Sequence, residues 1–126
     1  MEAFLLRVIA LREREYHELK EYPWFVDCTR QEAERYLTNL IQRRIKVFLV
    51  RPTNSNLFDV PYTVSLNNVR HEVEHIQIWR LAENDEPYHF SVKLNRLGEL
   101  KYRTIVDLID DLLAKGILIE PRFTQK

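Results

Sequence analysis

The fold is decided by the stretch Lys46-Val47-Phe48-Leu49-Val50-Arg51, which is followed by Pro52-Thr53-Asn54-Ser55-Asn56. Apolar residues fill positions 45–50 apart from one lysine, which predicts a buried strand that ends at an arginine and runs into a polar turn. Because side chains alternate between the two faces of a strand, Arg51 shares its face with Val47 and Leu49. The sequence therefore predicts a strand whose apolar face ends in a permanent positive charge.

The charge of Arg51 requires a partner, because a guanidinium on an apolar face is costly to desolvate unless an anion meets it. The fork of N–H donors in arginine suits a bidentate oxyanion such as a carboxylate or a phosphate. Two interpretations remain open from the residues alone. Arg51 forms an internal ion pair with a buried Asp or Glu, or it binds an external oxyanion.

Further blocks of sequence surround this strand in a definite order. They are Trp24-Phe25 and residues 29–37 upstream, and Pro61–Leu66 and Glu74–Ile78 downstream. With Phe48-Leu49-Val50-Arg51, these blocks resemble the Src homology 2 (SH2) domain family over residues 23 to 120, in order and spacing. The resemblance is greatest to adaptor-type members of lymphocyte signalling or phosphoinositide-kinase regulation. It implies a non-catalytic module that binds phosphotyrosine peptides.

The amino-acid composition limits which classes of protein the chain can belong to. The chain has 126 residues, 45% of them apolar, with 19 basic and 19 acidic side chains. This suits one domain with a real core, and zero net charge gives no argument for nucleic acid as a partner. The single Cys28 fits a reducing compartment, and no apolar run is long enough to span a membrane. We expect a cytoplasmic protein without membrane insertion.

The N-terminal segment favours a helix over residues 2–20. Its larger apolar residues lie near one face: Phe4, Leu5, Val8, Leu11 and Leu19. This segment packs on the domain, mediates self-association, or links to another domain. We therefore divide the chain into a helical arm over residues 1–22, the SH2-like domain over residues 23–121, and a tail over residues 122–126.

A second helix begins after Thr29, which is a good N-cap and forms a capping box with Glu32. Arg30 then lies in the first turn, where a positive charge is unfavourable next to the helix dipole unless an anion binds nearby. The expected buried stripe consists of Ala33, Tyr36, Leu37, Leu40 and Ile41.

The rest of the chain alternates strands and turns before a last helix. Strands are predicted over residues 61–66, 73–80 and 88–93, followed by an irregular loop around Gly98. Thr104 caps a final helix that ends near Gly116, and residues 117–120 can add a short strand. The predicted fold class is α+β, with a central antiparallel sheet flanked by two helices and an additional N-terminal helix.

Other chemistries lack a signature in the sequence. The four histidines and one cysteine have no metal-ligand spacing, no nucleophile elbow is present, and the carboxylate pairs fall on a helix face and a turn. Glycine-rich phosphate loops are excluded with two glycines in the chain. We therefore expect no enzyme activity, no catalytic residues, no metal and no cofactor.

The resemblance to SH2 domains assigns roles to residues near Arg51. It implies that Arg51 forms the floor of the phosphotyrosine pocket and grips two phosphate oxygens, while Arg30 clamps the phosphate and the ring. His75 packs against the tyrosine ring. The remaining expected phosphotyrosine contacts are Thr53, Asn54, Ser55, Asn56 and Gln77. Gln77 stands where many members carry a lysine, and Pro52 replaces the usual polar residue.

A second expected site is a groove for the peptide residues beyond phosphotyrosine. The resemblance places Ile76 beside the third of these, and Leu94, Leu97 and Leu100 lie on the opposite side of the groove. An apolar third residue is then preferred; alternatively, the leucines pack under the last helix. The alternative for the whole chain is an SH2-like structural or interaction domain that has lost phosphate binding.

Overall fold

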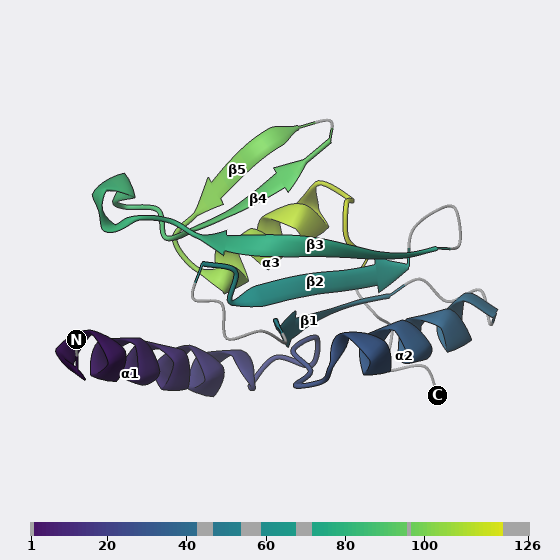
Figure 1. The fold of residues 1–126 in the computed structure, drawn as a ribbon. Helices are drawn as coiled ribbons and strands as arrows, with labels where there is room; N and C mark the ends of the chain where they lie inside the picture. Colours follow the sequence, from purple (N-terminus) through teal and green to yellow (C-terminus); the bar gives the residue numbers. More distant parts are fainter. Residues whose placement is uncertain (1, 43–46, 54–58, 68–71, 96, 120–126) are drawn as a thin grey trace.

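The computed structural model describes residues 2–42, 47–53, 59–67, 72–95 and 97–119. The elements are α1 (Glu2–Leu19), α2 (Arg30–Gln42), β1 (Phe48–Pro52), β2 (Tyr62–Asn67), β3 (Val73–Arg80), a 3₁₀ turn η1 (Glu83–Asp85), β4 (Phe90–Leu94), β5 (Gly98–Tyr102) and α3 (Ile105–Ala114). Figure 1 shows the antiparallel sheet together with helices α2 and α3, and the additional N-terminal helix α1. The predicted α+β fold class is confirmed.

The sheet has the simple order β1-β2-β3-β4-β5, with each strand antiparallel to the next. β3 and β4 pair only where Trp79 and Arg80 meet Ser91 and Phe90. The β4–β5 hairpin therefore turns away from the three-stranded part formed by β1, β2 and β3 (Figure 1). The expected irregular loop around Gly98 is wrong in part: Gly98 opens β5 at φ +72°, which glycine adopts without strain.

Alternation along β1, β2 and β3 gives the sheet two buried faces. On one face, Val50, Val64 and Ile78 pack against α3 and are fully buried. On the other face, Val47 packs against Leu37 and Leu40 of α2. Helix α3 thus covers one face of the sheet and α2 covers the other. The polar residues on the second face lie between α2 and the strands.

The start of α2 is fixed by the predicted capping box. The Thr29 N–H donates to the Glu32 carboxylate at 2.8 Å, and the Glu32 N–H donates to the Thr29 hydroxyl at 3.1 Å. Ala33, Leu37 and Leu40 of the expected stripe are buried. Tyr36 is 43% exposed, so its assignment to the stripe is wrong, and the side chain of Ile41 lies outside the described residues.

The last helix also begins as predicted, with the Thr104 hydroxyl accepting from the Asp107 N–H at 3.0 Å. Gly116 ends it at φ +74°, and the N–H groups of Ile117 and Leu118 then bond to the Leu112 carbonyl. The described part of residues 117–120 forms turns rather than the expected strand, because these two N–H groups cap the helix instead of pairing with the sheet.

The second half of α1 packs on the domain. Leu19 is 3% exposed within the main core, and the Glu15 carboxylate accepts from both terminal nitrogens of Arg80 at 2.9 Å each. The Tyr62 hydroxyl donates to the same carboxylate at 2.9 Å. These contacts support the interpretation that the arm packs on its own domain. Among the helices described, none combines the length and apolar character needed to cross a membrane.

Candidate anion-binding site

The register of the sheet gathers polar residues on the face that α2 covers. Arg51 of β1 lies opposite Thr63 of β2, and Thr63 lies opposite Gln77 of β3. In the neighbouring row, Ser65 of β2 lies opposite His75 of β3. Arginine, hydroxyls and imidazole therefore share one surface, although they come from three strands.

Arg51 is buried, and its contacts among the described residues are with uncharged or imidazole groups. It is 3% exposed; Nε donates to the Ser65 hydroxyl at 3.1 Å, Nη1 to the Pro52 carbonyl at 3.4 Å, and Nη2 lies 3.4 Å from Nδ1 of His75. No carboxylate of the described residues lies within ion-pair distance of this guanidinium. Burial lowers the pKa of Arg51 from its usual value. The internal ion pair considered from the sequence is therefore not found in the described part of the chain.

The unused donors of Arg51 have a defined geometry. Its three contacts occupy three of the five N–H groups of a guanidinium. One N–H on each terminal nitrogen is left without a partner among the described residues, and donors on these two nitrogens can bind two oxygens of a phosphate or carboxylate. A buried cation with two such donors has the groups needed to bind an anion.

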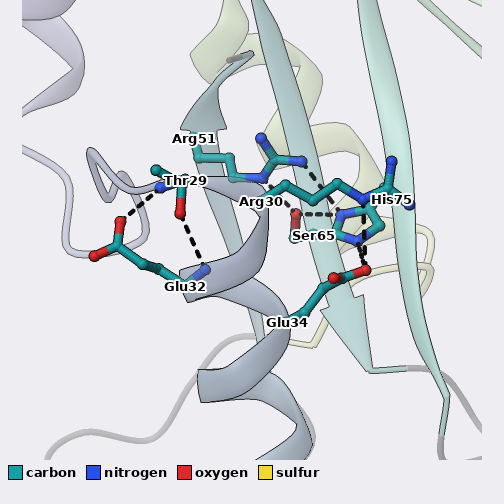
Figure 2. A network of polar contacts seen from close by, with 7 residues as sticks. All are labelled: Thr29, Arg30, Glu32, Glu34, Arg51, Ser65 and His75. Carbon is teal, nitrogen blue, oxygen red and sulfur yellow. Dashed lines mark hydrogen bonds and ion pairs between the residues drawn. The ribbon is translucent and has the colours of Figure 1, made fainter.

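His75 connects this arginine to helix α2. Its Nδ1 lies 2.8 Å from the Ser65 hydroxyl, and its Nε2 lies 3.0 Å from a carboxylate oxygen of Glu34 (Figure 2). The hydrogen bond from His75 is the main reason that the pKa of Glu34 is lowered from its usual value. A continuous polar network therefore runs from the sheet to the helix.

Arg30 brings a second guanidinium to the same site from the first turn of α2. Its side chain is 60% exposed, and its Nε lies 3.4 Å from the Glu34 carboxylate. The positive charge of Arg30 contributes to lowering the pKa of Arg51, although burial is the larger cause. Figure 2 shows both arginines on the side of the network where the helix begins.

Two of the other expected phosphotyrosine contacts, Thr53 and Gln77, lie beside this network next to Thr63. The Thr53 hydroxyl is 2.9 Å from the Thr63 hydroxyl, and the Thr53 N–H donates to the Pro61 carbonyl at 3.0 Å. Gln77 is exposed on β3, on the same face as His75. Asn54, Ser55 and Asn56 lie outside the described residues.

Three of the expected groove residues, Ile76, Leu94 and Leu100, pack with the core on the α3 side of the sheet. Ile76 is 9% exposed, and it lines a cavity of about 220 Å³ together with Leu94. The remaining described lining residues are Val47, Phe48, Leu66, Asn67, Glu74, Gly116, Ile117, Leu118 and Ile119. Leu100 is half-buried against the core, and Leu97 is 49% exposed; neither lines this cavity. The structure thus brings two of the four residues together.

Two residues of the site were missed in the sequence, and each left a signal. Ser65 belongs to the segment Tyr-Thr-Val-Ser-Leu-Asn of β2. Alternation along this strand places the Thr63 and Ser65 hydroxyls on one face. Glu34 follows Arg30 by four residues, so the two lie on one side of the helix. Neither signal identifies a contact with Arg51 or His75 without knowledge of the strand register.

Taken together, the structure is an α+β domain with a buried arginine that has no carboxylate partner among the described residues. A family model for the SH2 domain matches residues 24–112, and the chain belongs to this family. SH2 domains are non-catalytic signalling modules that bind phosphotyrosine peptides. No curated protein matches the chain. The match begins after α1, although α1 packs on the matched region.

Proposed function

We propose that this SH2 domain retains phosphotyrosine binding and acts as a non-catalytic recognition module for tyrosine-phosphorylated proteins. The observation that carries the proposal is the burial of Arg51 with two N–H groups, one on each terminal nitrogen, that have no partner among the described residues, and with no carboxylate partner among them either. A site of this kind is incomplete without an external anion, because an uncompensated buried charge is strongly destabilising.

In this proposal each residue has a separate task. Arg51 binds two phosphate oxygens from the floor of the pocket, and Arg30 approaches from the open side, where its exposed guanidinium also reaches the ring. His75 borders the ring. Thr53, Asn54, Ser55, Asn56 and Gln77 complete the contacts. The depth of Arg51 excludes phosphoserine, whose short side chain does not carry its phosphate that far.

The proposed setting is that of a cytoplasmic adaptor with a domain spanning residues 23–121. Peptide choice beyond phosphotyrosine is assigned to Ile76 and Leu94, which line a common cavity on the α3 side of the sheet. Leu97 and Leu100 complete the proposed groove from the β4–β5 hairpin. The partners are tyrosine-phosphorylated proteins, with no role for nucleic acid.

An SH2-like interaction domain without phosphate binding is the second candidate. It is favoured by the turn after β1, since Pro52 has no N–H and the N–H of Thr53 is already bonded to the Pro61 carbonyl. Two potential backbone donors are therefore absent from the phosphate site. This candidate predicts no difference between phosphorylated and unphosphorylated peptides.

Titration with a degenerate phosphotyrosine peptide pool, by isothermal calorimetry or fluorescence polarisation, separates the two candidates. Matched pools carry tyrosine or phosphoserine at the fixed position. We expect binding of the phosphotyrosine pool alone, and its loss in Arg51→Ala. Equal binding of the phosphorylated and unphosphorylated pools would support the interaction domain instead.

A further inference from the structure

Ser65 and His75 join Arg51 to Glu34 through a chain of hydrogen bonds. Arginine N–H groups only donate, so the Ser65 oxygen accepts from Nε of Arg51 and its own hydrogen is free to be donated. The nearest acceptor is Nδ1 of His75, at 2.8 Å. In the neutral tautomer that accepts at Nδ1, Nε2–H faces the Glu34 carboxylate oxygen at 3.0 Å and donates to it.

The opposite arrangement of the imidazole proton would disrupt the site. With the neutral ring's proton on Nδ1, the Ser65 hydroxyl could still accept it, but the ring would present a donor to Nη2 of Arg51, which can only donate, and a lone pair to the Glu34 carboxylate, which can only accept. Arg51 would then lose an inner partner that holds its guanidinium in place. A carboxylate opposite Nε2 prevents this, because an ionised carboxylate can only accept.

Glu34 also holds the exposed arginine in a useful orientation. It contacts Arg30 through Nε, at 3.4 Å, and both terminal nitrogens of Arg30 have no partner among the described residues. Those two nitrogens form the edge of the guanidinium that binds phosphate oxygens. One carboxylate thus contacts both side chains that surround the outer part of the pocket.

We infer that Glu34 is a positioning residue of the phosphotyrosine pocket. Its carboxylate selects the Nε2–H tautomer of His75, which keeps Ser65 and Arg51 in register, and it orients Arg30 toward the phosphate. This inference rests on the proposed function. It opposes the simple electrostatic expectation that a negative charge beside a phosphate site weakens binding.

The test compares three variants in the full chain. Glu34→Ala removes the acceptor and the charge, Glu34→Gln removes only the charge, and Asp110→Ala removes an exposed helical carboxylate from α3, on the other side of the sheet. The readouts are the ¹⁵N chemical shifts of the His75 ring in the free protein and the affinity for the phosphotyrosine peptide pool. Thermal unfolding reports whether each variant is folded.

For Glu34→Ala we expect a mixture of His75 tautomers and an affinity loss of about tenfold, by analogy with the lower end of the loss when a group that orients a metal-binding histidine is removed. Glu34→Gln keeps an acceptor for Nε2–H, so it should retain the tautomer and an affinity within about threefold of wild type. Asp110→Ala should change neither readout. Rescue by glutamine identifies orientation rather than charge as the role of Glu34.

Two results would overturn the inference. An unchanged tautomer in Glu34→Ala would show that Glu34 does not set the ring, and tighter peptide binding by both variants would show that it competes with the phosphate. If Glu34→Ala does not fold, loss of the Nε2–H tautomer of His75 in Glu34→Gln would also overturn the inference. A wild-type protein that binds no phosphopeptide would defeat the proposed function, while the tautomer measurement would still decide the role of Glu34.

Discussion

Nη2 of Arg51 lies 3.4 Å from Nδ1 of His75, although 24 residues separate the two along the chain. The two side chains come from β1 and β3, the strands on either side of β2, and the Ser65 hydroxyl between them contacts both. This relationship places a buried cation next to an imidazole. It makes the proposed phosphate subsite and the proposed ring subsite adjacent parts of one pocket.

Arg51→Ala should abolish phosphopeptide binding without unfolding the domain. A desolvated bidentate arginine contributes roughly 2–5 kcal/mol to binding, which is at least about thirtyfold in affinity. The free energy of unfolding should stay within about 1 kcal/mol of wild type or rise, because the substitution removes a buried charge without an anionic partner. Calorimetric titration and thermal unfolding measure both quantities.

Arg35→Ala, which truncates an exposed arginine of the same helix as Arg30, is the control for general loss of positive charge. It should bind as wild type does. An unfolded Arg51→Ala protein would mean that Arg51 is structural, and normal binding by that variant would place the phosphate pocket elsewhere.

Arg30→Ala should weaken binding less, by about 1–2 kcal/mol, because its contacts with phosphate are partly screened by solvent. The 60% exposure of this side chain, against 3% for the Arg51 residue, is the physical basis of the difference. Titrations of both variants with one peptide give the comparison directly. Equal affinity losses would contradict the assignment of Arg51 to the floor and Arg30 to the rim.

Glu15→Ala should destabilise the domain and leave the pocket intact. The substitution removes the carboxylate that accepts from Arg80 and Tyr62, whose bonds to it are 2.9 Å long. A lost hydrogen-bond partner of a charged, largely buried group reduces the free energy of unfolding by about 2–3 kcal/mol. Urea denaturation measures the loss, and the exposed Glu13→Ala in the same helix is the matched control.

Phosphopeptide affinity should stay within about twofold after removal of residues 1–20, since the proposed pocket consists of residues from Arg30 onward. Weaker phosphopeptide binding by a folded, shortened monomer would contradict the assignment of the pocket.

Self-association through residues 1–20 is a separate prediction. Sedimentation of the full and shortened chains tests it, and a dimer that dissociates on shortening is the expected sign of such contacts.

Ile76→Tyr should reduce a preference for apolar residues at the third position after phosphotyrosine, without changing phosphate dependence. Ile76 and Leu94 line one cavity, and burying an Ile, Leu, Val or Met there is worth about 1.5–3 kcal/mol. This corresponds to roughly ten- to hundredfold discrimination against Asp or Glu. An oriented peptide array reads the preference, and enrichment of acidic residues in the wild-type protein would refute it.

Asp111→Asn should destabilise the domain near neutral pH and have little effect in acid. Hydrogen bonds from Lys115, at 2.7 and 2.8 Å, and from Tyr102 lower the pKa of Asp111. A lowered folded-state pKa stabilises the protein above the unfolded pKa of about 3.9, and this stability is lost as pH falls through the folded value. Because the side chain is 34% exposed, the difference at pH 7 should be below about 1 kcal/mol.

Unfolding measured between about pH 7 and pH 2 compares wild type with the variant. The two curves should converge on the acid side, once Asp111 is protonated in both the folded and unfolded states. A difference that persists unchanged at low pH would show that the carboxylate charge is not the stabilising feature.

The sequence by itself determined the features that depend on neighbouring residues. Both helix starts follow from a Thr hydroxyl that reaches N–H groups of its own first turn, and the face of Arg51 follows from alternation along one strand. The SH2 family itself was recognisable because its blocks lie in order along the chain. These properties need no knowledge of which strands pair.

Only the tertiary structure decided what surrounds Arg51. The register of β1, β2 and β3 places Ser65 and His75 beside it, and α2 then brings Glu34 within 3.0 Å of His75. The exposure of Tyr36 and the pairing of Gly98–Tyr102 as β5 were decided in the same way. The physical reason is that burial, ion pairing and strand pairing depend on groups brought together from distant parts of the chain, and local periodicity carries no information about their partners.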